Sequence, residues 1–376
     1  MNRPDAPILL AAGGTGGHMF PAEALARELI ARGHAVALVT DRRGGAFGDA
    51  LPGVQVHRIR AAAPSGGLVG KMRAVAELAL GTLQAQRLMA SLRPAAVVGF
   101  GGYPSVPAVI AAQRAAVATV LHEQNAVLGR ANRLLAGGAR VLATSFPQVA
   151  MVKPGDAGKV SRIGNPVRPA VIAVRAQPYP DLVDGGPVRL LVTGGSQGAS
   201  VFASVIPEAL GLLPPELRGR VRLALQARAE DVEAARAALE RAGVQAEVSS
   251  FFTDMPERLS ACHLAITRAG ASTVAELTVA GRPAILVPYP HAMDDHQTAN
   301  AQAVADAGGA WVMPQPSLTA SSLASRLEAL LTMPAMLTKA AAAARNWGAP
   351  DAASRLADLV LETTGGTCAP VREAAE

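Results

Sequence analysis

Short apolar runs alternate with longer amphipathic stretches along most of the chain. In the first half the apolar runs predict strands, and the stretches between them predict helices. The predicted strands are residues 8–12, 35–40, 95–99, 118–121 and 141–143, with helices at 21–31 and 71–91. This βαβ rhythm is typical of a parallel sheet covered by helices.

The rhythm breaks in a segment rich in proline and glycine, residues 152–187, and then starts again. The second set of predicted strands is 189–193, 222–225, 246–250, 264–267 and 284–288. With 376 residues, half of them apolar, the chain is long enough for two buried cores. We therefore predict an α/β protein with two Rossmann-like domains, residues 1–165 and 166–345. A C-terminal helix at 346–365 is expected to cross back to the first domain, and a disordered tail covers 366–376.

Two similar glycine turns, LLAAGGTGGH at residues 9–18 and LLVTGGSQGA at 190–199, each follow an apolar run. Such a turn lets backbone N–H groups at a helix N-terminus meet a phosphate, although glycines can also simply cap a strand. Two turns about half the chain apart predict two nucleotide-binding folds facing each other. In the first turn the third glycine of a dinucleotide fingerprint would fall on Met19, which argues against a dehydrogenase; Asp41, after the second strand, keeps that alternative open.

Composition narrows the function classes. Aromatic residues make up only 3% of the chain, which argues against nucleic-acid stacking platforms, and the net charge of +6 comes from dispersed arginines that favour phosphates or an anionic membrane surface. Two distant cysteines, Cys262 and Cys368, indicate neither a disulfide framework nor a zinc site and fit a reducing cytoplasm. The N-terminal apolar run is too short for a signal peptide. Residues 94–113 carry no charge, but their glycines and prolines favour a strand, a turn and a helix over a membrane span.

Two further polar clusters follow strands of the first half: GFGGYPS at residues 99–105 and HEQN at 122–125. The carboxyl ends of parallel strands share one edge of the sheet, where ligands bind in open α/β folds. Both clusters and the first glycine turn should therefore converge. Taken singly, His122 or Glu123 is more typical of a hydrogen-bonded structural residue than of a catalytic one.

The second half adds five motifs: GNPVR at 164–168, GGSQGA at 194–199, FTDM at 252–255, RAGASTVAE at 268–276 and HAMDDHQTAN at 291–300. With GGTGGH, GFGGYPS and HEQN they form eight motifs, in order, over residues 9–300. Together they resemble the MurG family of murein glycosyltransferases. These enzymes add N-acetylglucosamine to the undecaprenyl-linked muramyl peptide.

The resemblance implies a GT-B fold, in which the donor UDP-N-acetylglucosamine (UDP-GlcNAc) lies between two Rossmann-like domains and is held mainly by the second. Glu276 is expected to accept hydrogen bonds from the ribose, although a carboxylate near a helix start has an electrostatic role as well. Backbone N–H groups of a helix N-terminus, together with nearby donors, would bind the diphosphate. The residues that would bind the diphosphate are Ala271, Ser272, Thr273, Ser196 and Arg168. The resemblance places Phe252 at the uracil. It places five residues at the donor sugar: Gln297, Asn125, Thr15, Gly16 and Gly17.

The implied reaction is displacement at the anomeric carbon, with inversion, by the C4 hydroxyl of undecaprenyl-pyrophosphoryl-MurNAc-pentapeptide (lipid I), which gives lipid II. His18 is the candidate base, because it follows a glycine turn and a histidine with an ordinary pKa of about 6.5 is largely neutral at physiological pH. His18 also fits two other roles, orienting the acceptor pyrophosphate or capping the helix. Glu123 and His122 are second choices. The sequence has no D-x-D triplet, and neither a metal nor a cofactor is expected.

A lipid acceptor requires a membrane. Residues 68–92 place apolar side chains beside Lys71, Arg73 and Arg87, which suits a peripheral membrane-binding helix or, equally, a buried core helix. The resemblance places the enzyme on the cytoplasmic face of the inner membrane, with cell-wall synthesis and division proteins as partners.

Two other function classes stay open on the sequence alone. Another GT-B enzyme, such as a sugar transferase acting on diacylglycerol, would share the donor site and differ at GFGGYPS and HEQN. A non-catalytic nucleotide-sugar sensor would need Glu276 and the arginines but no base. One departure from the family pattern is that Ala227 and Arg228 follow Gln226 where a glycine is common, so no donor contact is assigned there.

Overall fold

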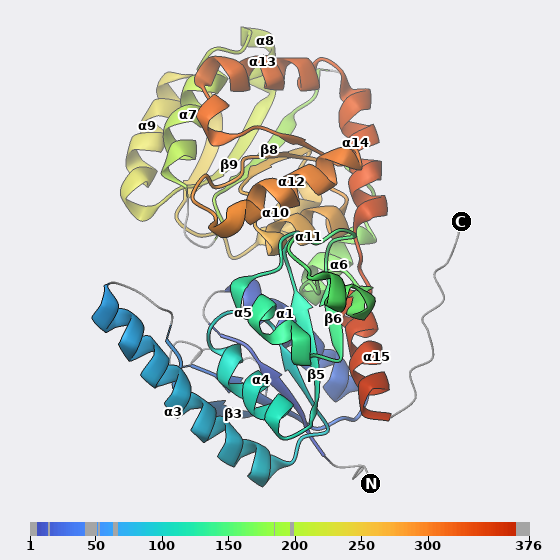
Figure 1. Ribbon diagram of the computed structural model, residues 1–376. Helices are drawn as coiled ribbons and strands as arrows, with labels where there is room; N and C mark the ends of the chain where they lie inside the picture. The colour runs from blue at the N-terminus through green and yellow to red at the C-terminus, as the bar shows by residue number, and fades with distance from the viewer. Residues whose placement is uncertain are drawn as a thin grey trace. The chain divides into compact units, whose positions relative to one another are not determined.

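The computed structural model describes residues 6–13, 16–41, 51, 53–62, 67–183, 185–195 and 199–365, apart from the side chains of Leu68 and Val69. The predicted tail at 366–376 lies outside these residues. The chain forms two compact units (Figure 1). The first consists of Met1–Gln124, Leu128–Pro166 and Asp351–Glu376, and the second of Asn125–Val127 and Val167–Pro350.

The first unit contains a seven-stranded parallel sheet in the order β3-β2-β1-β4-β5-β6-β7. Its strands are β1 Ile8–Ala11, β2 Val36–Thr40, β3 Gln55–Arg58, β4 Ala96–Gly99, β5 Ala118–Glu123, β6 Val141–Thr144 and β7 Val160–Arg162. Its helices are α1 Gly16–Ala31, α3 Leu68–Leu92, α4 Ser105–Arg114, α5 Arg130–Leu135 and α15 Ala352–Gly365. Alternate residues of β1 enter two separate cores, so both faces of the sheet are covered.

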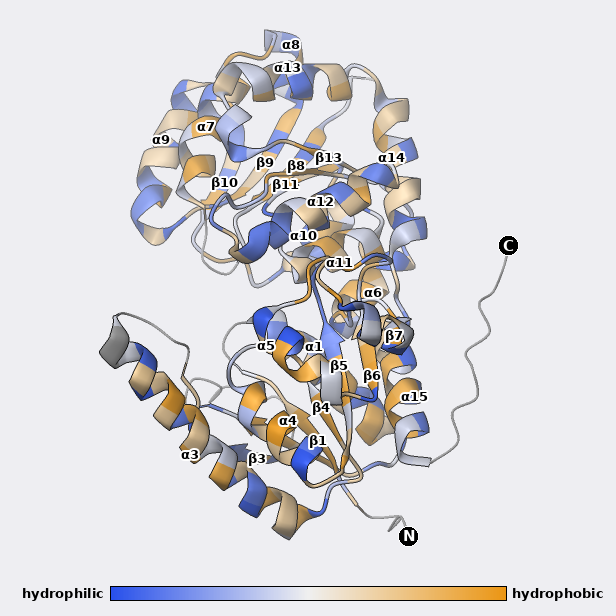
Figure 2. Cartoon of the chain, in the orientation of Figure 1, coloured by the Kyte–Doolittle hydropathy of each residue, from blue (hydrophilic) through white to orange (hydrophobic). Residues whose placement is uncertain are grey.

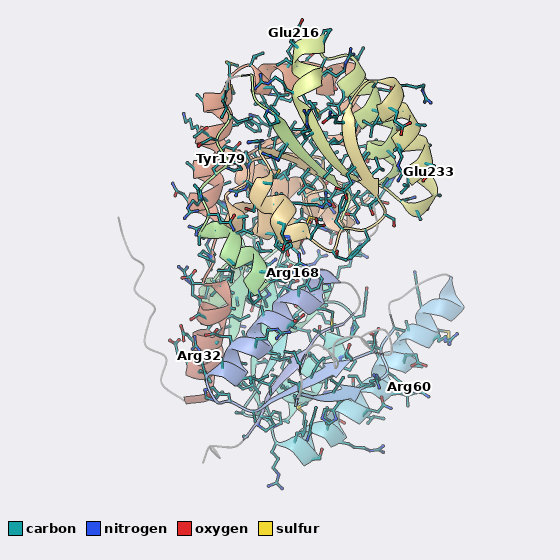
Figure 3. All side chains as sticks on the ribbon, turned by 180° about the vertical axis from the view of Figure 1, so that it is seen from behind. Arg32, Arg60, Arg168, Tyr179, Glu216 and Glu233 are labelled. Carbon is teal, nitrogen blue, oxygen red and sulfur yellow. The ribbon has the colours of Figure 1, made fainter. Side chains whose placement is uncertain are left out.

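Helices α1 and α15 cover one face of this sheet, and α3, α4 and α5 cover the other (Figure 1). Leu356 and Val360 of α15 are fully buried. Arg32, labelled in Figure 3, fixes the same helix by donating to Asp358 Oδ1 at 2.5 Å and to Ser354 Oγ at 2.7 Å. The C-terminal helix is thus part of the first unit's core.

The second unit contains a six-stranded parallel sheet in the order β10-β9-β8-β11-β12-β13. Its strands are β8 Val188–Thr193, β9 Val221–Gln226, β10 Gln245–Ser249, β11 Leu264–Thr267, β12 Ala284–Leu286 and β13 Ala310–Val312. Its helices are α6 Pro169–Arg175, α7 Ser200–Gly211, α8 Pro215–Arg220, α9 Val232–Arg241, α10 Met255–Ala261, α11 Ala271–Ala280, α12 His296–Asp306, α13 Ala320–Leu331 and α14 Pro334–Trp347.

The second sheet therefore has the strand order of a Rossmann fold, 3-2-1-4-5-6 in its own numbering, and the first sheet has the same order with β7 added at its edge. The order reverses between β1 and β4 in the first unit and between β8 and β11 in the second. In such sheets ligands bind outside the carboxyl ends of the strands at this reversal. The fold thus marks one candidate ligand site in each unit.

The predicted central strands are confirmed, and several peripheral elements were missed. Strands β3, β7 and β13 and helix α6 were not predicted, and the segment interpreted as a linker contains β7 and α6. Helix α1 begins at Gly16, five residues earlier than predicted, although Pro21 lies inside it. The returning helix begins at Ala352 rather than 346, because α14 continues to Trp347 in the second unit.

Helix α3 is largely exposed, with only part of its surface buried in the core. Ala74, Ala85 and Met89 are buried, whereas Met72 and Val75 are 65% and 66% exposed, and Figure 2 shows hydrophobic and hydrophilic residues mixed along its length. None of the described helices is both long enough and apolar enough to span a membrane.

Candidate active site

His18 lies in the first turn of α1, directly after Gly16 and Gly17, and Thr15 lies outside the described residues. Its ring rests against the turn that follows β4. A Cβ atom added at Gly102 would lie 3.3 Å from His18 Cδ2, and both Gly101 and Gly102 have positive φ, +82° and +71°. Glycine at these two positions therefore lets the imidazole lie close to the backbone. The ring is half-buried, and Nδ1 lies 3.0 Å from Gln124 Oε1.

His122 is completely buried at the end of β5. Its Nε2 lies 3.3 Å from the Gly164 carbonyl oxygen. Burial lowers the pKa of His122 to about 4, with the neighbouring His18 adding to the effect, so the ring is neutral at physiological pH.

Glu123 is also buried, and one of its carboxylate oxygens accepts hydrogen bonds from residues at the start of α5. Glu123 Oε2 accepts hydrogen bonds of 2.8 Å from the Gly129 N–H and from Asn132 Nδ2. Because Gly129 is the N-cap residue of α5 and Asn132 lies inside that helix, the carboxylate fixes the start of α5 to the end of β5. The convergence of the first-domain clusters at one sheet edge is confirmed, with His18 the most exposed of the three candidate bases.

Asn125 belongs to the second unit, where Asn300 of α12 holds it. Asn300 Nδ2 donates to Asn125 Oδ1 at 3.1 Å and to the Ala269 carbonyl at 3.0 Å, and its Oδ1 accepts the Ala126 N–H at 2.7 Å. Asn300 is fully buried. A side chain from α12 thus fixes Asn125 against the loop that leads into α11. The sequence analysis quoted Asn300 only as the end of a motif and gave it no role.

Arg168 and Glu276 form an ion pair in the second unit. Arg168 Nε and Nη2 each lie 2.9 Å from Glu276 Oε1. Burial raises the pKa of Glu276, and the adjacent guanidinium opposes that rise. Both contacts end on Oε1, so the pairing with Arg168 leaves Oε2 for another partner.

The N-terminus of α11 begins with Ala271, Ser272 and Thr273. Its N-cap residue, Gly270, has no side chain that could accept from the first N–H groups, which have no partner within the helix. The buried Ser272 hydroxyl oxygen has no hydrogen-bond partner among the described residues. This end of α11 follows β11, at the sheet's reversal point, and offers several donors to an anion.

Gln297 of α12 joins two loops beside α11. Its Oε1 accepts hydrogen bonds from the Ala269 N–H at 3.2 Å and from the Tyr289 N–H at 2.9 Å. The Nε2 donors take no part in these bonds. Ser196, the second-domain glycine-turn candidate, lies outside the described residues.

Phe252 is buried, with the Arg258 guanidinium 3.8 Å above the centre of its ring. The ring is therefore part of the packing, and only the backbone of Phe252 suits base recognition. The preceding Phe251 is 69% exposed in the same loop after β10, and the sequence analysis missed it although the two are adjacent. Gln226 is bonded to Thr193 and Ser250 and bridges strand ends.

Comparison with known proteins identifies the family. The glycosyltransferase family 28 N-terminal domain matches residues 8–143, and the family 28 C-terminal domain matches residues 189–356. The UDP-N-acetylglucosamine–N-acetylmuramyl-(pentapeptide) pyrophosphoryl-undecaprenol N-acetylglucosamine transferase of Rhodospirillum centenum is 64% identical over 360 residues, which cover 96% of this chain and 95% of that protein. The chain belongs to glycosyltransferase family 28. An equally named family 28 protein of Paramagnetospirillum magneticum is 56% identical over 94% of this chain and 96% of its own length.

Solved structures agree with the family 28 assignment. The crystal structure of Acinetobacter baumannii MurG matches with a TM-score of 0.78 and 30% identity, covering 94% of this chain and 99% of that one. The predicted resemblance to the MurG family and the predicted GT-B fold are thus confirmed. This chain is a glycosyltransferase, and more specifically a hexosyltransferase.

Proposed function

We propose that this family 28 enzyme transfers N-acetylglucosamine from UDP-GlcNAc to the C4 hydroxyl of undecaprenyl-pyrophosphoryl-MurNAc-pentapeptide, with inversion. The proposal rests above all on the near full-length similarity to relatives named for these substrates. The described residues supply groups for donor binding, for removal of the acceptor proton and for stabilising the departing UDP.

The second unit is the proposed donor site. Glu276 Oε2 accepts from the ribose hydroxyls while Arg168 holds Oε1. Backbone N–H groups of Ala271, Ser272 and Thr273 bind the diphosphate at the N-terminus of α11. Gln297 Nε2 faces the donor sugar, and Ser196 adds a donor to the diphosphate.

Two further groups of the donor, the uracil and the sugar, also need protein contacts. The backbone of Phe252 reads the uracil edge, because its ring is occupied by Arg258. Asn125, fixed by Asn300, contacts the sugar from the second unit.

The first unit is the proposed acceptor site, with His18 as the general base. His18 is preferred over His122 and Glu123 because His122 is fully buried and Glu123 already accepts two hydrogen bonds at the start of α5. The acceptor oxygen bonds to the anomeric carbon as its proton moves to His18. The bond from that carbon to the phosphate oxygen breaks, and its electron pair leaves with UDP, stabilised by the N–H groups of α11.

The enzyme is proposed to act as a peripheral protein on the cytoplasmic face of the inner membrane. Met72, Val75 and Leu83 are exposed on α3, near Lys71 and Arg73. Apolar side chains that enter the interface beside cations that attract anionic lipids suit such a surface. Proteins of cell-wall synthesis and division are the expected neighbours there.

Product analysis tests the proposal. The enzyme is incubated with UDP-GlcNAc and the lipid-linked muramyl-pentapeptide, with diacylglycerol as the alternative acceptor. We expect the muramyl lipid to gain the mass of one N-acetylhexosamine, in the β configuration by NMR. Transfer to diacylglycerol alone would favour the rival GT-B reaction. Donor binding without transfer to either acceptor would favour a nucleotide-sugar sensor.

A further inference from the structure

Gln124 has its carboxamide fixed in one orientation. The side chain is 2% exposed, and its Nε2 lies 3.0 Å from the Phe100 carbonyl oxygen and 3.1 Å from the His122 carbonyl oxygen. Carbonyl oxygens only accept hydrogen bonds, so the amide nitrogen must face them. The amide oxygen is thereby turned towards His18.

His122 reinforces this orientation from behind. Its Nε2 faces the Gly164 carbonyl oxygen at 3.3 Å and so carries the proton, which leaves a lone pair on Nδ1. That Nδ1 lies 2.9 Å from Gln124 Nε2, whose two N–H donors are shared among this nitrogen and the two carbonyl oxygens. Because burial keeps the ring neutral, His122 retains this acceptor at physiological pH.

The orientation of Gln124 determines which ring nitrogen of His18 carries the proton. Gln124 Oε1, 3.0 Å from His18 Nδ1, can only accept, so Nδ1 carries the proton of the neutral ring. The lone pair is then on Nε2, the nitrogen that a general base needs. After proton transfer the same Nδ1–H still donates to the amide oxygen, which stabilises the imidazolium. Asparagine plays the equivalent part in Cys-His-Asn catalytic sites.

We propose that Gln124 is a positioning residue that sets the tautomer of His18, with His122 fixing Gln124 in turn. The hydrogen-bond chain runs from the Gly164 carbonyl through His122 and Gln124 to His18. Its catalytic part rests on the proposed function, in which the proton of the acceptor C4 hydroxyl moves to His18 Nε2. The tautomer itself does not depend on the substrate.

The first test is spectroscopic and uses no substrate. Long-range ¹H–¹⁵N spectra of the ¹⁵N-histidine-labelled protein separate protonated from unprotonated ring nitrogens, and a His18→Gln sample identifies the His18 signals among the seven histidines. We expect His18 of the wild type to be protonated on Nδ1 and bare on Nε2. A wild-type His18 protonated on Nε2 alone would overturn the proposal.

Two substitutions at Gln124 separate a positioning role from a structural one. Gln124→Met removes both the acceptor and the donor, whereas Gln124→Glu keeps an oxygen for His18 Nδ1 and loses the amide donor. We expect the Met variant to shift the His18 proton towards Nε2 and to lose about 10- to 100-fold in kcat with little change in the KM for donor. The Glu variant should keep the Nδ1 proton and retain more of kcat than the Met variant, although it loses the donor to the Phe100 and His122 carbonyls.

A merely structural role would lower the activity of both variants alike and leave the tautomer unchanged, which would contradict the proposal. Gln113→Met is the matched control, because Gln113 also donates from Nε2 to a backbone carbonyl, that of Leu135 at 2.9 Å, outside the site. It should leave both kcat and the His18 spectrum as in the wild type.

If Gln124→Met changes the tautomer of His18 but not kcat, His18 is not the general base. The proposed mechanism then fails, whereas the hydrogen-bond chain stands. No turnover by the wild type would instead point to another acceptor.

Discussion

Arg168 donates a hydrogen bond of 2.9 Å from Nε to Glu276 Oε1, and its Nη2 forms an ion pair of 2.9 Å with the same oxygen. The two residues lie 108 positions apart in the chain and meet where α6, whose N-cap residue is Arg168, lies against α11. Arg168 is labelled in Figure 3. Arg168 therefore fixes the Glu276 carboxylate. It also opposes the effect of burial, which raises the pKa of Glu276. The sequence analysis assigned Arg168 to the diphosphate and did not foresee this pair.

Removal of the Glu276 carboxylate should weaken donor binding. Hydrogen bonds to a charged group are worth about 1.5–3 kcal/mol, so Glu276→Ala should raise the Kd for UDP-GlcNAc by about 10- to 100-fold in calorimetry. Glu233→Ala is the control, because Glu233 also pairs with an arginine, Arg236, but on the exposed surface of α9. Equal Kd values for wild type and Glu276→Ala would remove Glu276 from the donor site.

His122 should make the protein less stable as the pH falls. Its pKa is about 4 in the folded protein and about 6.5 in the unfolded chain, so between these values only the unfolded chain binds the proton. The free energy of unfolding should then fall by up to about 3 kcal/mol as the pH drops from 6.5 to 4. Urea denaturation of wild type and His122→Gln across this range measures the difference; parallel pH profiles would contradict it.

Gly81 should not tolerate a side chain. A Cβ atom at this position of α3 would lie 1.9 Å from the Arg60 carbonyl oxygen, so the helix or the backbone beside it must move. Gly81→Ala should lower the free energy of unfolding by about 2 kcal/mol or more, measured by urea denaturation. Gly137→Ala, where a Cβ meets nothing within 4 Å, should have a small effect. Similar losses in both variants would contradict the steric explanation.

The exposed face of α3 should bind anionic membranes. Each lysine or arginine near such a surface contributes about 1 kcal/mol, so Lys71→Glu with Arg73→Glu should weaken binding to anionic vesicles by tenfold or more. The exposed pair Arg326 and Lys339 of α13 and α14 offers a control with the same change of charge. Vesicle co-sedimentation compares the two. Equal loss in both double variants would mean that net charge, not α3, governs binding.

The parts of the fold that could be predicted are those with a local signal. The apolar runs of β1 and β8 are fully paired central strands, and the glycines after them are visible in the sequence. Strands β3, β7 and β13 have three or four residues each and are only partly buried, so their apolar pattern is weak. Helix α6 begins at Pro169 in a segment whose prolines suggested a linker.

The candidate site shows the same division. The motifs gave the positions of His18, His122 and Glu276, because they end or follow strands at the binding edge. The partners came only from the structure: Gln124 stands two residues from His122, yet its bond to His18 spans 106 positions. Asn300 joins Asn125 across 175 positions. Such pairings depend on how the chain folds back, which one sequence does not reveal.

Release of UDP from UDP-GlcNAc, with and without the lipid-linked muramyl-pentapeptide, tests the central claim most directly. Wild type, Glu276→Ala and His18→Ala are compared. We expect acceptor-dependent turnover by the wild type, a raised KM for the donor in Glu276→Ala, and a kcat lowered by about 100-fold or more in His18→Ala with a similar KM. A wild type that binds the donor but releases no UDP with this acceptor, or a His18→Ala variant with unchanged kcat, would contradict the account.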